Sequence, residues 1–228
     1  MTVRPDSAGR RDPEKHRMAQ PFVGVHFPKA GGSSLSVQLS EHLADRVEYD
    51  YGHDPLGPAA FETAGRLPPG RTGVYGHFRP ERYAQVPDVL RFTFLREPVD
   101  NLISIYFFWQ TRPEQPNRPV LSRFLRERPS IEAFAAYEPM RRLLSETYFG
   151  GYDVSRFDFI GFHDSRAGDV EQLGRMLGLP LVPAVKVNVT VHGASEREAL
   201  RSDPARLRAL QDLLVDDIRF YERLRSRR

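Results

Sequence analysis

FVGVHFPKAGGSSL, residues 22–35, is the stretch that decides the fold. Its first six residues form an apolar run that is typical of a short buried strand. A turn follows at 28–32, and Ser33 is placed to cap a helix whose apolar positions continue to Leu43. The stretch therefore predicts a strand, a glycine turn and a helix in direct succession.

Along the rest of the chain, apolar runs alternate with helical patterns. The runs at 72–76, 90–95 and 157–162 are predicted to be strands, and helices are predicted over 99–110 and 169–177. Strands that alternate with helices predict an α/β fold, in which a mostly parallel sheet is flanked by helices on both faces.

Three further segments have weaker patterns. Residues 50–72 are rich in Pro and Gly and are predicted to be loop, whereas residues 111–150 are predicted to be helical but irregular. One long helix is predicted near the C-terminus. Ser202 would cap it, and a single apolar stripe would run from Leu207 to Tyr221.

The composition of the 228-residue chain is that of an ordinary globular protein. We expect a single domain over 21–228 and a disordered, arginine-rich tail over 1–20. The absence of cysteine excludes disulfides and a cysteine nucleophile, and the net charge of +3 does not demand a nucleic-acid partner. No targeting segment is evident and no apolar run reaches the ~20 residues of a membrane-spanning helix, so a cytoplasmic protein is predicted.

The turn after the first strand has the composition of a phosphate-binding loop. Backbone N–H groups at Gly31 and Gly32 can approach an anion closely, and the helix N-terminus adds a partial positive charge. Lys29 supplies a full charge, and Ser33 and Ser34 supply hydroxyl donors. The lysine precedes the glycines, so the turn does not match the P-loop pattern G-x-x-x-x-G-K-[ST]. The alternative is an ordinary strand–turn–helix junction with a surface lysine.

A second polar group of residues follows the third predicted strand, in FLREPVDNLIS at 94–104. Arg96 ends the strand, and Ser104 lies about two helical turns further on, where it can meet the same ligand group. A guanidinium fork and a hydroxyl suit a phosphate monoester. In the alternative, Arg96 pairs with Glu97 or Asp100 and Ser104 is simply buried in the helix.

Together the two motifs resemble the sulfotransferases that use 3′-phosphoadenosine 5′-phosphosulfate (PAPS). PKAGGSSL at 28–35 is similar to their 5′-phosphosulfate loop, and FLREPVDNLISIYFF at 94–108 is similar to their 3′-phosphate segment. Tyr75-Gly76-His77, between the two, resembles the Gly-His of the uronyl and heparan-sulfate 2-O-sulfotransferases. The resemblance implies a P-loop-kinase-like parallel sheet and favours the branch that acts on carbohydrates.

The resemblance also implies a role for each matching residue, with PAPS as donor, PAP as product and no metal. His77 would be the general base, and Lys29 would neutralise charge on the leaving group. Independently of the resemblance, Arg79 and Arg82 follow His77 and could meet an anionic or polar acceptor, and the favoured alternative is that they are surface arginines on a loop. The implied cofactor-binding residues are Lys29, Ala30, Gly31, Gly32, Ser33, Ser34, Arg96, Ser104, Lys186 and Asn188, of which the last two match a late segment that folds over the cofactor.

Tyr-Gly-His also occurs at 51–53, so His53 competes with His77 for the role of base. His77 ends a predicted strand, and ligands of open parallel sheets lie beyond the carboxyl ends of the strands. His53 lies in a predicted loop. The sequence therefore favours His77, and the alternative is that its ring is satisfied by a neighbouring carbonyl.

The expected function is transfer of a sulfuryl group from PAPS to an acceptor hydroxyl, with a carbohydrate acceptor favoured. Relatives often carry a histidine where Tyr75 stands, and they are larger and membrane-anchored, so the acceptor's identity does not transfer. Three alternatives remain: an aryl or small natural-product sulfotransferase, a P-loop-type nucleotide phosphotransferase, and a non-enzymatic basic anion-binding protein. The phosphotransferase predicts a lysine after the glycines and a magnesium carboxylate, and neither is evident in the sequence.

Overall fold

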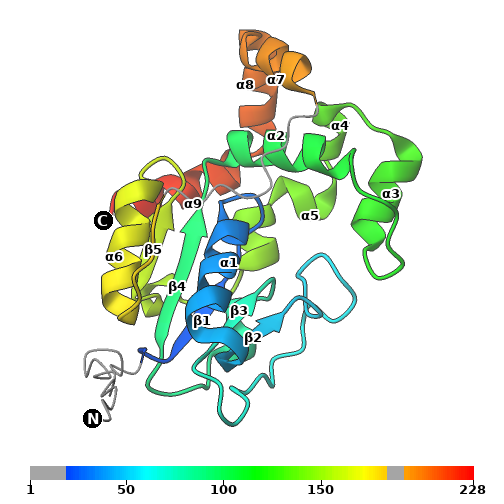
Figure 1. Cartoon of the computed structure of the whole chain (residues 1–228). Coiled ribbons are helices and arrows are strands. Elements are labelled where there is room, and N and C mark those ends of the chain that lie inside the picture. Colours follow the sequence, from blue (N-terminus) through cyan, green and yellow to red (C-terminus); the bar gives the residue numbers. More distant parts are fainter. Residues whose placement is uncertain (1–18, 184–192) are drawn as a thin grey trace, which may run out of the picture.

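The computed structural model describes residues 19–183 and 193–228. At its centre is a five-stranded sheet with the strand order β2-β3-β1-β4-β5, in which every pairing is parallel (Figure 1). The predicted α/β class is therefore confirmed. The strands are β1 (Phe22–Val25), β2 (Val47–Asp50), β3 (Gly73–Gly76), β4 (Leu90–Leu95) and β5 (Phe159–Phe162).

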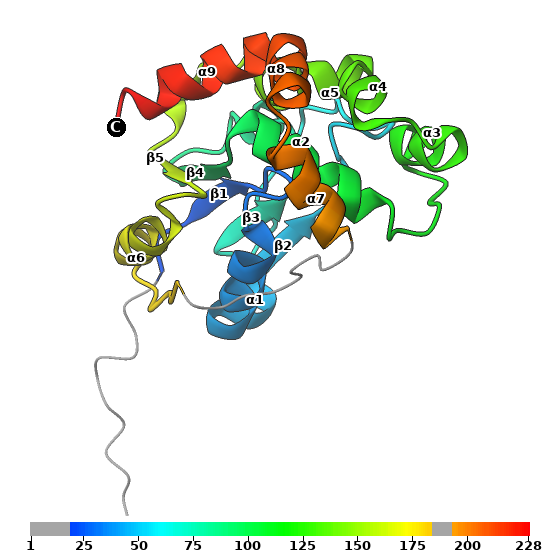
Figure 2. The same cartoon turned by 90° about the horizontal axis from the view of Figure 1, so that it is seen from above.

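Helices cover both faces of the sheet. Seen from above in Figure 2, α1 and α6 lie on one side of it, and α5 and α9 lie on the other. The helices are α1 (Gly32–Leu43), α2 (Pro98–Trp109), α3 (Pro119–Glu127), α4 (Ile131–Ala135), α5 (Glu138–Arg141), α6 (Arg166–Leu177), α7 (Ala194–Arg201), α8 (Pro204–Leu213) and α9 (Val215–Arg225). None of the helices in this described part of the chain has the length and apolar character that a membrane crossing requires.

The core follows from the central position of β1. All four residues of β1 are buried, because β3 and β4 pair with it on either side and helices pack above and below. Leu35 and Leu39 of α1 and Leu173 of α6 are completely buried against one face. Burial on both faces explains why the strands read as continuous apolar runs in the sequence.

Three local features differ from the predictions. The strand β2 was not predicted. It lies at the edge of the sheet and pairs with β3 from Val47↔Gly73 to Asp50↔Gly76. In place of the single predicted C-terminal helix there are two, α8 and α9, because the backbone leaves the helical conformation at Leu214 (φ −101°, ψ 17°). The N-cap of α8 is Asp203 and not Ser202. The Asp203 carboxylate accepts hydrogen bonds from two N–H groups of the first turn.

The boundaries of the first helix and of the tail also differ slightly from expectation. Gly31 is the N-cap of α1, so Ser33 lies inside the helix. Of the predicted tail, residues 1–18 lie outside the described residues. Ala19 is buried, and the Gln20 N–H donates to the Leu177 carbonyl, so these two residues belong to the domain.

The irregular region at 111–150 contains α3, α4, α5 and a π-helical turn, η4 (Leu143–Tyr148). Asp217 of α9 holds this turn in place. Its carboxylate accepts from the Leu144 N–H at 2.8 Å, and from the N–H and hydroxyl of Ser145 at 2.8 and 2.5 Å. Asp217 is 2% exposed, so these bonds replace the water that it lost.

We expect Asp217→Asn to destabilise the fold by roughly 2–3 kcal/mol, because an amide NH2 would face N–H donors in a buried site. Urea unfolding monitored by circular dichroism measures this. Asp216→Asn is the matched control, since the ion pair of Asp216 with Arg142 is partly exposed and should contribute only about 0–1 kcal/mol. Equal losses in the two variants would contradict the assigned role of Asp217.

Candidate active site

A cavity of about 760 Å³ opens at the carboxyl ends of the parallel strands. This edge of the sheet is where ligands of open α/β folds bind, and the volume is in the range of nucleotide-sized ligands. Each strand leads into a residue that lines the cavity: Tyr51 after β2, His77 after β3, Lys29 after β1, Arg96 after β4 and His163 after β5.

The glycine turn forms the floor of this cavity at the N-terminus of α1. Lys29 (φ 55°) and Gly31 (φ 92°) both have left-handed backbone conformations, and no side chain caps the helix. Gly31, Gly32, Ser33 and Ser34 line the cavity. Because the first N–H groups of a helix have no partners within it, this uncapped N-terminus is suited to an anion.

The turn also packs against its surroundings more closely than a side chain would permit. A Cβ atom on Gly32 would collide with the His26 ring and would lie 2.6 Å from the Tyr75 hydroxyl. Ala30 is completely buried and does not line the cavity, so only its backbone could serve a ligand.

Lys29 lies among other positive charges. Its Nζ lies 4.1 Å from the centroid of the Phe108 ring. Burial, and then repulsion from Arg96 and Arg197, lowers the pKa of Lys29 from 10.5 to about 8. An anion bound beside Lys29 would stabilise the charged form and raise this pKa again.

Arg96 and Ser104 line the same cavity, as their spacing predicts. The Arg96 Nη1 donates to the Lys29 carbonyl at 3.4 Å, which links β4 to the glycine turn. Its Nε is buried and has no hydrogen-bond partner among the described residues. A half-buried guanidinium that keeps an unused, buried donor is a candidate ligand contact.

His77 is held by the residues around β1. Its Nδ1 lies 2.6 Å from the His26 carbonyl and 3.3 Å from the Tyr148 hydroxyl, and its ring stacks on the His26 ring with centroids 4.3 Å apart. A carbonyl can only accept, so we assign the proton to Nδ1 and an available lone pair to Nε2. Burial foremost lowers the pKa of His77 below 6.5, although Asp54 and the His26 carbonyl oppose this.

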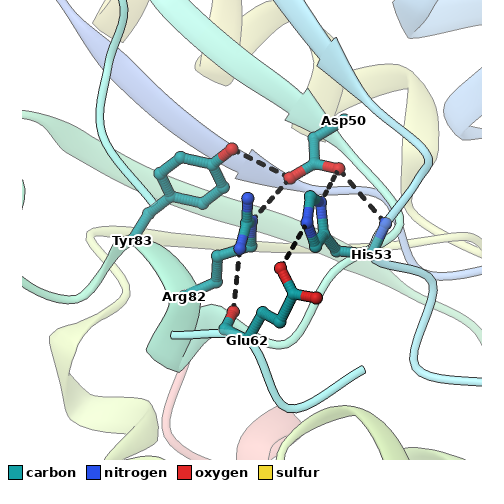
Figure 3. A network of polar contacts seen from close by, with 5 residues as sticks. All are labelled: Asp50, His53, Glu62, Arg82 and Tyr83. Atoms are coloured by element: carbon teal, nitrogen blue, oxygen red, sulfur yellow. Dashed lines mark hydrogen bonds and ion pairs between the residues drawn. The ribbon is translucent and has the colours of Figure 1, made fainter. Parts of the chain in front are cut away.

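The competing histidine lies elsewhere. His53 does not line the cavity. It belongs to the polar network of Figure 3, where its Nδ1 lies 2.7 Å from Asp50 and its Nε2 lies 3.2 Å from Glu62. Arg82 belongs to the same network and donates to the Asp50 carboxylate at 2.8 Å and to the Glu62 carbonyl at 2.9 Å (Figure 3). Both residues therefore anchor the loop that follows β2.

Arg79 also serves the fold. Its guanidinium donates to the carbonyls of Glu146, Thr147 and Gly150, and it pairs with Glu81. Neither Arg79 nor Arg82 lines the cavity, so the structure does not bring these predicted acceptor contacts to the site. The predicted cofactor residues Lys186 and Asn188 lie outside the described residues.

The sequence analysis overlooked several residues that line the cavity. His26, Arg112, Arg118, Arg166, Arg197 and Arg201 all contribute. One of them follows a rule that could have found it, because His26 lies at the carboxyl end of the first predicted strand, just before the glycine turn. The described lining contains seven basic side chains and one acidic one, Asp54, so the cavity is strongly suited to anions.

Comparisons with known proteins add little to this geometry. No protein-family model matches the chain, and a search of curated proteins finds no match. A solved structure described as a sulfotransferase from Alicyclobacillus acidocaldarius is 19% identical, with 86% of this chain and 96% of that chain covered and a TM-score of 0.40. A likeness this distant carries no argument, and the functional assignment rests on the site. Among the described residues no group of three or more His, Cys, Asp or Glu side chains could hold a metal ion.

The lowered pKa of Lys29 predicts that anion binding takes up protons. An anion raises this pKa above its free value of about 8, so affinity for PAP should fall as pH rises through 8 to 10. Calorimetry in two buffers of different ionisation enthalpy measures the proton uptake. Lys29→Arg should bind with no such pH dependence, since arginine stays charged. A pH dependence that persists in this variant would show that another group titrates.

Proposed function

We propose that this protein is a sulfotransferase that moves a sulfuryl group from PAPS to an acceptor hydroxyl. The observation that supports this best is the convergence of three separate motifs on one cavity. Lys29 with the glycine turn, Arg96 with Ser104, and His77 come from segments that follow β1, β4 and β3. These are the segments through which the sequence resembles PAPS-dependent sulfotransferases.

In this proposal each of the two cationic motifs binds a different part of the donor. The uncapped N-terminus of α1 and Lys29 bind the 5′-phosphosulfate, and Arg96 and Ser104 bind the 3′-phosphate. The unused Nε of Arg96 supports the second assignment, because a phosphate monoester offers several acceptor oxygens.

The transfer itself is an in-line displacement at sulfur. The acceptor oxygen forms a bond to sulfur while the bond from sulfur to the 5′-phosphate oxygen breaks, and PAP leaves with the electron pair. Lys29 and the loop N–H groups stabilise the charge that develops on the leaving phosphate. The acceptor proton passes to Nε2 of His77, which is neutral at pH 7 because burial lowers its pKa.

The acceptor side of the proposal is less specific. We propose a saccharide, with Arg112 and Arg118 replacing Arg79 and Arg82 as the cations that meet it. Arg118 pairs with Asp54 across 3.6 Å, and Arg112 lies 5.3 Å from the centroid of the Phe108 ring. Arginine and aromatic surfaces together suit a polar ring that carries negative charge.

A nucleotide phosphotransferase remains the second candidate, because it would use the same edge of the sheet. The position of Lys29 before the glycines disfavours it. Labelled PAPS incubated with an acceptor panel, without added metal, tests the proposal directly. Transfer of label to a saccharide supports it. Transfer only to phenols would contradict the saccharide acceptor but not sulfuryl transfer. The proposal would be overturned if no label were transferred from PAPS while labelled ATP with magnesium transferred its phosphoryl group.

We expect His77→Ala to lower turnover by about 10²- to 10⁴-fold, the usual contribution of a general base. Its affinity for PAP should change little, since the base acts on the acceptor. His53→Ala is the matched control from the second Tyr-Gly-His, and it should keep its turnover because His53 lies outside the cavity. If His53→Ala were inactive and His77→Ala active, the base would be wrongly assigned.

Arg96→Ala should reduce the preference for PAP over AMP. The loss of one charge-assisted contact to the 3′-phosphate corresponds to ~1.5–3 kcal/mol. Competition binding with the two nucleotides measures the ratio of their dissociation constants. A ratio equal to that of the unmodified protein would remove Arg96 from the 3′-phosphate site.

A further inference from the structure

Arg166 reaches the glycine turn from a distant part of the sequence. It is the first residue of α6, directly after the loop that follows β5. Its Nη2 donates to the Ser34 hydroxyl. A Cβ on Gly31 would lie 2.7 Å from Nη1 and 2.9 Å from Cζ of Arg166, so the guanidinium occupies the space beside that glycine.

The charge of Arg166 is not balanced by the protein. No carboxylate in residues 19–183 and 193–228 forms an ion pair with it, and its Nη1 is buried without a hydrogen-bond partner there. Burial foremost lowers the pKa of Arg166, and Tyr75 opposes this shift. A half-buried guanidinium without a counter-ion is unfavourable, and a bound anion would offset this cost.

Arg166 is also linked to the loop through Ser34. The Ser34 hydroxyl donates its proton to the Gly31 carbonyl at 2.9 Å and accepts from Arg166. Ser34 and Arg166 both line the cavity, and Ser34 is almost completely buried beneath it. The guanidinium therefore lies between the turn and the space that a ligand would enter.

We propose that Arg166 is a second cation of the oxyanion site at the glycine turn, and that it binds the same phosphate- or sulfate-type group as Lys29. The nucleotide assignment rests on the proposed function: there, Arg166 contacts the 5′ group of the donor and not the 3′-phosphate. Its contacts with Gly31, at the end of the turn, and with Ser34, in the first turn of α1, assign it to the 5′ side.

Three ligands distinguish a contact with the 5′ group from one with the 3′-phosphate. They are PAP, AMP, which has only the 5′-phosphate, and adenosine 3′-phosphate. Arg166→Met should weaken PAP and AMP about 10- to 100-fold, the effect of losing one charge-assisted contact, and should leave adenosine 3′-phosphate unchanged. Arg166→Lys should recover part of the loss, because it keeps the charge without the fork. Arg175→Met removes an exposed arginine from the last turn of the same helix and should change none of the three affinities.

A role for Arg166 in supporting the turn alone predicts a different result. If Arg166 only supported the turn, Arg166→Met would weaken all three ligands together and lower the melting temperature, which would overturn the proposal. Arg166→Gln, which can still donate to Ser34, carries the test if the Met variant does not fold. If the unmodified protein bound inorganic phosphate but none of the nucleotides, the proposed function would fail, and Arg166 would then be tested by the loss of phosphate binding alone.

Discussion

The close packing of the glycine turn is the constraint on which the site depends. Gly32 has no room for a side chain, because His26 and Tyr75 approach it, and Gly31 (φ 92°) has a left-handed backbone beside the Arg166 guanidinium. The same His26 fixes His77 by accepting its Nδ1 proton and by stacking on its ring. The turn, His77 and Arg166 are therefore positioned by one set of contacts.

The electrostatics of the cavity follow from this packing. Lys29, Arg96 and Arg166 are brought together at the ends of three strands, and burial lowers the pKa of each. Such an arrangement costs folding free energy in the free protein, and a bound anion would offset this cost.

Much of the fold could be predicted from the sequence, because four of the strands are buried on both faces and read as apolar runs. The strand at 47–50 could not, since its two middle residues are only partly buried and it lies at the edge of the sheet. Local motifs in the sequence predicted four of the residues that line the cavity, namely Lys29, Arg96, Ser104 and His77. Arg166 and Arg118 were missed because only the tertiary fold brings them to the cavity. Arg79 and Arg82 looked available in the sequence, but carbonyls and carboxylates distant in the chain engage them.

The central claim, that the cavity accepts a nucleotide with a 3′-phosphate and a 5′ anionic group, is tested most directly by calorimetric titration with PAP, ATP and duplex DNA. The account predicts that PAP binds without added metal and at least about tenfold more tightly than ATP, a difference of ~1.4 kcal/mol. Tighter binding of ATP with magnesium would indicate a phosphotransferase. Binding of DNA in preference to either nucleotide would contradict an enzyme site altogether.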